Sequence, residues 1–350
     1  MFQIAIVNDM PLAVEALRRV VSSVKDYKIA WIAYNGVEAV EKCAGNVPDL
    51  ILMDLIMPEM DGVEATRQIM QNSPCAILVV TATVTGNAAK VFDAMGHGAL
   101  DAVNTPVLGI GGTLDGATHL LSKIQTIARL TGKQSWKQLE PVPFASGAVQ
   151  QKQSLIAIAA STGGPLVISR ILKHLPSDFR IPIVIVQHVD AEFAPGLAEW
   201  LATETSLPVR LIQSDERPAD HSVLLAGTNE HLILSAREKL QYTTEPAEYP
   251  YRPSADVFFR SVAQNWKGQG AAVLLTGMGR DGAEGLLALR QMGWMTIAQD
   301  QATSIVYGMP KAAAELNAAR KILPEGEIAQ ALIEWKTQRK GAKARSEEEK

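Results

Sequence analysis

Short apolar runs alternate with amphipathic segments along most of the chain, and this alternation predicts strands and helices in turn. In the amino-terminal part the apolar runs are too short for helices, and the segments between them carry apolar residues at helical spacing. The predicted strands are 3–7, 28–34, 49–53, 76–80 and 99–103, and the predicted helices lie near 11–24, 36–44, 61–71, 87–95 and 115–130. Alternating strands and helices indicate a parallel sheet that helices cover on both faces.

The same alternation returns in the carboxyl-terminal part and predicts a second doubly wound α/β domain. The strands are expected near 154–160, 181–187, 207–213, 271–276 and 295–299. Three shorter runs, at 222–226, 231–235 and 239–243, alternate apolar and polar residues and predict an antiparallel hairpin at one edge of the sheet.

Apolar periodicity is lost twice, and these two places define the domain boundaries. Residues 131–153 are rich in Gln, Pro, Ser and Gly, which is typical of a linker. Residues 338–350 mix Lys, Arg and Glu and are expected to form a frayed, solvated tail. We therefore predict domains at 1–130 and 154–337.

Composition narrows the function classes. The formal net charge of −4 provides no basic field for nucleic acid. No run approaches the roughly 20 apolar residues of a membrane span, and Asp9 lies where a signal peptide would be apolar. The only cysteines, Cys43 and Cys75, lack metal-ligand spacing and are expected to be free thiols. We expect a cytoplasmic protein without membrane insertion.

Two acidic residues follow strands of the first predicted domain. Asp9 comes after the first strand and Asp54 ends the third. Carboxylates at neighbouring strand ends repel each other unless a cation lies between them, and Mg²⁺ binds one or two carboxylates while keeping water for a phosphate. Asp54 would then be a covalent phosphoryl acceptor. The alternative is that both acids merely cap helices.

The second predicted domain presents a serine at a strand end. Ser161 ends the apolar run Ile-Ala-Ile-Ala-Ala and is followed by Thr162, Gly163 and Gly164, with Pro165 suited to the first turn of a helix. Open α/β sheets bind ligands at the carboxyl ends of their strands. Gly163 and Gly164, together with the backbone amide of Met278, could approach a developing oxyanion.

A base and an acid follow other strands of this domain. Of the six histidines, His188 alone ends a strong apolar strand. Asp281 lies in a glycine-rich turn after the strand that begins at Ala271, which predicts a Ser161–His188–Asp281 triad. Three other carboxylates at or near strand ends are rivals for the acid: Asp190, Asp215 and Asp300.

The glycine-rich turn also permits a nucleotide-binding interpretation. Residues 277–282 satisfy Gly-x-Gly-x-x-Gly, follow a strand and precede a helix, and Asp300 lies beyond them, as in a dinucleotide-binding fingerprint. Against this interpretation, Asp281 places a carboxylate where a pyrophosphate would bind, and Ser161 and His188 are left without a role.

The first domain resembles the receiver domain of two-component response regulators. The resemblance rests on Leu-Ile-Leu-Met-Asp-Leu-Ile-Met-Pro and on Val-Val-Thr-Ala, and it implies a flavodoxin-like fold. It makes Asp54 the phosphorylated aspartate, Thr81 the switch hydroxyl, and Asp9, Asp54 and the carbonyl of Ile56 the Mg²⁺ ligands. There are two departures: Asn8 replaces one residue of the usual acidic pair, which weakens Mg²⁺ binding, and Thr105 replaces the usual switch lysine.

The second domain resembles the catalytic domain of the chemotaxis protein-glutamate methylesterase family, CheB. The matching stretches are Ala-Ser-Thr-Gly-Gly-Pro, Val-Gln-His, Tyr-Arg-Pro-Ser-Ala-Asp-Val, Leu-Leu-Thr-Gly-Met-Gly-x-Asp-Gly and Tyr-Gly-Met-Pro-Lys-Ala. The resemblance implies a Rossmann-like domain with Ser161 as nucleophile, His188 as base and Asp281 as acid. Thr162 and Met278 would line the site. The departures in the receiver look most like the methylesterases of Wsp-type surface-sensing systems.

Together the resemblances imply a hydrolase regulated by a receiver. It would demethylate glutamate methyl esters on methyl-accepting chemoreceptors, deamidate receptor glutamines, and accept a phosphoryl group from a histidine kinase. Mg²⁺ would serve the receiver, and the hydrolase step would need no cofactor. A non-catalytic scaffold that docks receptors is the alternative.

Overall fold

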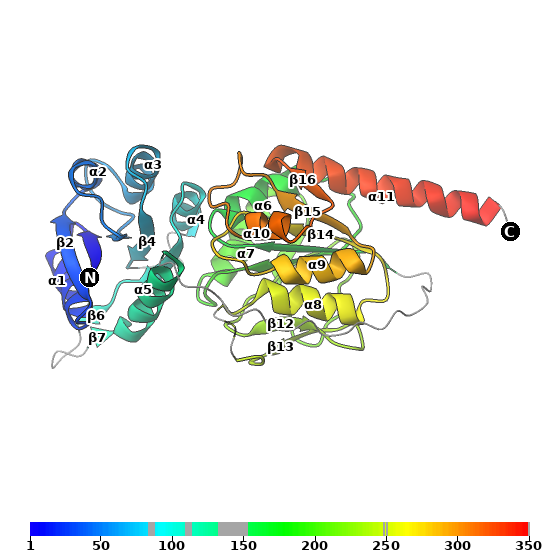
Figure 1. The fold of residues 1–350 in the computed structure, drawn as a ribbon, viewed down its shortest axis with the longest axis horizontal. Helices are drawn as coiled ribbons and strands as arrows, with labels where there is room; N and C mark the ends of the chain where they lie inside the picture. The colour runs from blue at the N-terminus through cyan, green and yellow to red at the C-terminus, as the bar shows by residue number, and fades with distance from the viewer. Residues whose placement is uncertain (83–87, 109–113, 132–152, 248, 250, 349–350) are drawn as a thin grey trace. The chain divides into compact units, whose positions relative to one another are not determined.

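The computed structural model describes residues 1–82, 88–108, 114–131, 153–247, 249 and 251–348. The chain divides into two compact units, Met1–Glu140 and Pro141–Lys350, and the division falls within the predicted linker. Of that linker, residues 132–152 lie outside the described residues. Figure 1 shows both units.

The first unit is a parallel sheet in the order β2-β1-β3-β4-β5 with helices between the strands. One face packs on α1 and α5 through residues such as Ile4, Leu52 and Leu17. All ten predicted elements are present, with ends that differ by a few residues. Their bounds are β1 Phe2–Val7, α1 Pro11–Ser22, β2 Tyr27–Ala33, α2 Gly36–Gly45, β3 Leu50–Met53, α3 Gly62–Asn72, β4 Ala76–Thr81, α4 Ala88–Gly96, β5 Asp101–Asn104 and α5 Ala117–Thr131, with the short pair β6 Val107–Leu108 and β7 Leu114–Asp115 between β5 and α5.

The second unit contains a larger parallel sheet in the order β10-β11-β9-β8-β14-β15-β16. One face packs on α8, α9, α10 and a separate hairpin, β12–β13. The bounds are β8 Leu155–Ala160, α6 Gly164–Lys173, β9 Ile183–Gln187, α7 Ala194–Glu204, β10 Val209–Leu211, β11 Val223–Leu225, β12 His231–Leu234, β13 Leu240–Thr243, α8 Ala255–Asn265, β14 Gly270–Leu274, α9 Ala283–Gln291, β15 Met295–Gln299, α10 Met309–Glu315, β16 Lys321–Leu323 and α11 Glu325–Glu348.

Three details of the second unit differ from the prediction. The run at 222–226 is not part of the hairpin: β11 pairs in parallel with β9 and β10, because Val223, Leu224 and Leu225 are all buried. The edge strand β16 was not predicted; two of its three residues are exposed, so it has no buried apolar run. The predicted frayed tail from 338 continues α11 as helix through Glu348.

The strand order places the predicted site. From β8 the chain moves to β9 on one side, whereas β14 pairs with β8 on the other side. The carboxyl ends of β8 and β14 therefore flank a topological switch point, which is where open α/β sheets bind ligands. Ser161 follows β8, and the glycine-rich turn follows β14.

Candidate active site and receiver site

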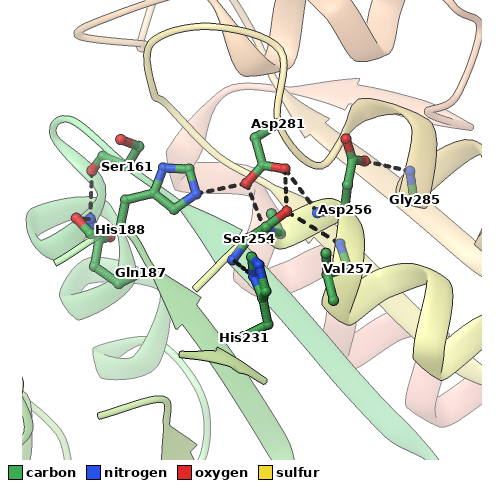
Figure 2. A network of polar contacts seen from close by, with 10 residues as sticks. Ser161, Gln187, His188, His231, Ser254, Asp256, Val257, Asp281 and Gly285 are labelled. Carbon is green, nitrogen blue, oxygen red and sulfur yellow. Dashed lines mark hydrogen bonds and ion pairs between the residues drawn. The ribbon is translucent and has the colours of Figure 1, made fainter. Parts of the chain in front are cut away.

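The structure brings His188 and Asp281 into direct contact. The Nε2 atom of His188 lies 2.8 Å from Oδ2 of Asp281, and both side chains are almost fully buried. Figure 2 shows the imidazole ring between Ser161 and Asp281. The rival carboxylates have other partners: Asp215 pairs with Lys239, and Asp300 accepts hydrogen bonds from Thr303. The third rival, Asp190, accepts from the backbone amide of Glu192.

The charge of Asp281 determines which nitrogen of His188 carries the proton. Burial alone would raise the pKa of Asp281, but hydrogen bonds from His188, Asp256 and Ser254 hold it below its ordinary value. An ionised carboxylate only accepts hydrogen bonds, so Nε2 of His188 must be the donor. The lone pair is then on Nδ1, which is buried and has no hydrogen-bond partner among the described residues. Nδ1 is therefore available as a proton acceptor.

The amino end of α8 holds Asp281 in place. The Ser254 hydroxyl donates to Oδ1 at 2.8 Å, the amide of Ala255 donates to Oδ2 at 2.7 Å, and the amide of Asp256 donates to Oδ1 at 3.0 Å. These bonds are drawn in Figure 2. The first amides of a helix lack partners within the helix and favour a negative charge. Asp281 satisfies them, and its orientation toward His188 is fixed in return.

A buried histidine, His231, supports this arrangement through a hydrogen bond with Ser254. Nδ1 of His231 accepts the amide proton of Ser254 at 3.2 Å, so Nε2 donates to the carbonyl of Pro246 at 3.0 Å. His231 is fully buried, and desolvation lowers its pKa, which keeps the ring neutral. The sequence reasoning assigned no role to His231 or Ser254. The matching stretch Tyr-Arg-Pro-Ser-Ala-Asp-Val was the available signal for Ser254, because Ser-x-Asp before an apolar run is typical of a helix N-cap.

Ser161 is held by its neighbours on both adjacent strands. Its amide donates to the carbonyl of Thr276 at 3.0 Å, and its carbonyl accepts from Nε2 of Gln187 at 2.8 Å. A Cβ at Gly277 would lie 2.7 Å from the Cβ of Ser161, so only glycine fits there. Within the described residues, the Ser161 hydroxyl makes no hydrogen bond to the His188 ring. Such contacts are often long in free enzymes and shorten when substrate binds.

The predicted oxyanion donors differ in availability. The amide of Gly164 already donates to the carbonyl of Ser161 at 2.9 Å, so Gly164 lines the turn without offering a donor in this conformation. Gly163 has φ 77°, a left-handed conformation that suits glycine, and is the N-cap of α6. The amide of Met278 has no hydrogen-bond partner among the described residues. Thr162 is buried, and its carbonyl accepts from the Thr276 hydroxyl.

The receiver unit places its predicted residues around Asp54. The Asn8 side-chain amide donates to Oδ2 of Asp54 at 3.0 Å, and the amide of Leu55 donates to Oδ1 at 2.7 Å. Burial and the nearby charge of Asp9 raise the pKa of Asp54 to about 6, although amides of Leu55 and Ile56 act in the opposite direction. A cation would stabilise the ionised form of this buried carboxylate, because it would offset the repulsion from the charge of Asp9.

The donor set around Asp54 fits a divalent cation only in part. Asp9 and Asp54 supply two carboxylates, which is the number that Mg²⁺ uses when it keeps several waters. Asn8 occupies one oxygen of Asp54 with an amide donor. Among the described residues, no group of three or more His, Cys, Asp or Glu side chains is placed to hold a metal.

The predicted switch residues lie at the ends of β4 and β5. Thr81 is buried, whereas Thr105 is partly buried, and the amide of Thr105 donates to the carbonyl of Thr81 at 3.0 Å. Thr105 cannot supply the ammonium group that pairs with a phosphoryl oxygen.

Comparison with known proteins agrees with this geometry in both units. Residues 156–332 match the family model for CheB methylesterase, and residues 4–108 match the model for the response regulator receiver domain. No helix within the described parts of the chain has the length and apolar character that a membrane crossing requires.

Similar proteins span nearly the whole chain. A protein-glutamate methylesterase/protein-glutamine glutaminase of Pseudomonas aeruginosa is 54% identical over 333 residues, covering 95% of this chain and 99% of its own. One from Bordetella avium is 56% identical over 327 residues, covering 93% and 95%. The crystal structure of the Thermotoga maritima CheB methylesterase catalytic domain is 34% identical with a TM-score of 0.50, covering 53% of this chain and 100% of that one. This chain therefore belongs to the CheB methylesterase family, and a response-regulator receiver domain precedes its catalytic domain.

Proposed function

We propose that this chain hydrolyses glutamate methyl esters on chemoreceptors, releasing glutamate and methanol, and deamidates receptor glutamines at the same site. The observation that carries the proposal is the bond between His188 and Asp281, which leaves Nδ1 unprotonated on a ring that lies between Ser161 and Asp281 (Figure 2). Relatives at 54–56% identity bear the name protein-glutamate methylesterase/protein-glutamine glutaminase. A cytoplasmic location is part of the proposal, in keeping with the free thiols of Cys43 and Cys75.

The proposed chemistry follows from the roles of the three residues. The Ser161 oxygen attacks the ester carbonyl while Nδ1 of His188 takes its proton, and Asp281 stabilises the imidazolium that forms. The tetrahedral intermediate places its negative oxygen near the Met278 amide. His188 then gives the proton to the leaving oxygen, methanol departs, and Ser161 is left as an acyl ester of the glutamate side chain.

The acyl-enzyme is resolved by the reverse order of steps. Water replaces methanol, Nδ1 of His188 takes a proton from it, and the serine oxygen leaves with that proton. A glutamine side chain would follow the same path with ammonia as the leaving group. Each proton transfer uses the same nitrogen, so the fixed orientation of the His188 ring serves both halves of the reaction.

The test is methanol release from methylated receptor. We expect Ser161→Ala and His188→Ala to lower kcat by several orders of magnitude, on the order of a million-fold by analogy with other serine hydrolases. Release at the wild-type rate by Ser161→Ala protein would refute the nucleophile. A scaffold without catalytic function would release no methanol, and its receptor binding would be unchanged in both variants.

The receiver is proposed to control the hydrolase through phosphorylation of Asp54. A histidine kinase is the proposed phosphodonor, and Asp9, Asp54 and the carbonyl of Ile56 would hold Mg²⁺, which neutralises the phosphoryl oxygens. Thr81 is the last residue of β4, and we assign the switch hydroxyl to it. Methanol release should change when a phosphodonor is added, and Asp54→Ala should abolish that change. The assignment to Wsp-type surface-sensing systems stays a prediction.

A further inference from the structure

An aromatic ring covers one face of the proposed base. The rings of Tyr251 and His188 are stacked, with centroids 4.5 Å apart and planes 7° from parallel. Tyr251 lies in the segment between β13 and α8, three residues before Ser254. The same short segment therefore supplies Ser254, which holds the acid, and Tyr251, which contacts the base.

The contact restricts a motion that the hydrogen bond to Asp281 leaves open. A single bond from Nε2 fixes one edge of the imidazole, but the ring can still rock about the line that joins Nε2 to Oδ2. A parallel ring at stacking distance opposes that motion because tilting would bring the two rings into collision. The direction of the Nδ1 lone pair is set by both contacts together.

The contact also acts on the charge that appears during catalysis. When Nδ1 takes the serine proton, the imidazole becomes a cation, and the face of an aromatic ring attracts a cation. Asp281 acts at the edge of the imidazole, whereas Tyr251 acts at its face. Among the described residues, Asp281 is the charged group that bonds to this ring. The backbone amide of Asp256 donates to Asp281, and the guanidinium of Arg252 donates to the carbonyl of Ala247.

We propose that Tyr251 is a positioning residue for the base, which holds the plane of the His188 ring and stabilises the imidazolium through its aromatic face. The proposal rests on the proposed esterase function. It assigns the effect to the ring of Tyr251 and not to its hydroxyl group, which gives the experiment a matched pair of substitutions.

The experiment compares Tyr251→Leu with Tyr251→Phe in the full chain, with methylated receptor as substrate. Leucine is expected to lower kcat about tenfold and change KM less than about twofold, because the transition state alone carries the charge. The acidic side of the kcat/KM profile should move to lower pH by about half a unit to one unit, since the protonated ring loses the energy of one cation–π contact. Phenylalanine should restore most of kcat and the wild-type profile.

The possible results separate this proposal from the proposed function. Absence of Ser161-dependent methanol release in the wild type would refute the function itself. Wild-type activity with an unmoved acidic side in Tyr251→Leu, or equal losses in the Phe and Leu variants, would overturn the role of Tyr251. Thermal melting of both variants is measured first, and Tyr251→Met, which also lacks an aromatic ring, replaces Leu if that variant unfolds.

Discussion

Ser254 donates its only hydroxyl proton to Oδ1 of Asp281 across 2.8 Å, in a position that is completely buried. The same residue is the N-cap of α8, where its oxygen accepts from the amide of Val257 at 3.3 Å. Its backbone amide is fixed by His231. One side chain therefore ties the start of a helix to the proposed catalytic acid, so the two roles must be separated by experiment.

Ser254→Ala should lower kcat about tenfold, because a hydrogen bond to a charged group contributes about 1.5–3 kcal/mol. It should also lower the free energy of unfolding by about 1 kcal/mol through loss of the N-cap. The catalytic part is isolated by a double-mutant cycle with Asp281→Asn, in which Ser254→Ala should cause little further loss of kcat. Additive losses would mean that Ser254 does not act through Asp281. Ser254→Thr, which keeps the hydroxyl, is the matched control.

Asp256→Asn should stabilise the fold at neutral and alkaline pH. Burial and the charge of Asp281 raise the pKa of Asp256 to about 8, and its Oδ1 accepts from the amide of Gly285 at 2.6 Å. A raised pKa in the folded state gives stability that is complete below the unfolded value and is lost as pH rises to about 8. An asparagine oxygen keeps the Gly285 bond without this loss.

The measurement for Asp256 is urea unfolding at several pH values. The free energy of unfolding of the variant should match that of the wild type near pH 4 and exceed it by about 5 kcal/mol near pH 8, given about 1.4 kcal/mol for each of the roughly four units between the ordinary pKa of an aspartate and about 8. The exposed Asp178 supplies the control, since Asp178→Asn removes a carboxyl from the surface of the same unit. A pH-independent difference between Asp256→Asn and wild type would contradict the explanation.

The sequence alone predicted the parts of the site that follow buried strands. Ser161, His188 and Asp281 each come after an apolar run, and parallel strands bring their carboxyl ends to one edge. The strands β11 and β16 were misassigned or missed because each has three residues, too few for a periodicity to appear. Short strands in a sheet are determined by their neighbours more than by their own pattern.

The contacts that orient the proposed triad could not be predicted in the same way. Tyr251, Ser254 and His231 reach the site from a loop and a hairpin strand, and their positions depend on how that segment packs over the sheet. No local pattern specifies that Ser254, 27 positions before Asp281, will donate to its carboxylate, because that contact depends on the geometry of the intervening loop. Gln187 was visible in Val-Gln-His, yet its bond to the Ser161 carbonyl follows from the pairing of β8 with β9.

Asn8→Asp should strengthen Mg²⁺ binding by the receiver. The substitution replaces the amide that donates to Oδ2 of Asp54 with a carboxylate and so adds one negative charge beside Asp9. We expect the Kd for Mg²⁺ to fall about tenfold, which corresponds to about 1.4 kcal/mol. Calorimetric titration with Mg²⁺ alone measures the change, and Asn72→Asp provides a control at a distant surface position. An unchanged Kd would show that Asn8 does not weaken the site.

Phosphorylation of Asp54 by a small phosphodonor should depend on pH through the Asp54 carboxyl itself. Its pKa is raised to about 6 by burial and by the charge of Asp9, and only the ionised form is a nucleophile. The initial rate at low Mg²⁺ should therefore rise as pH increases through about 6 and level off above it.

A bound cation favours the carboxylate, so saturating Mg²⁺ should move the midpoint to lower pH. Asp9→Asn should also move the midpoint measured at low Mg²⁺ downward, because it removes the neighbouring negative charge. A midpoint that neither Mg²⁺ nor Asp9→Asn displaces would contradict this account of Asp54.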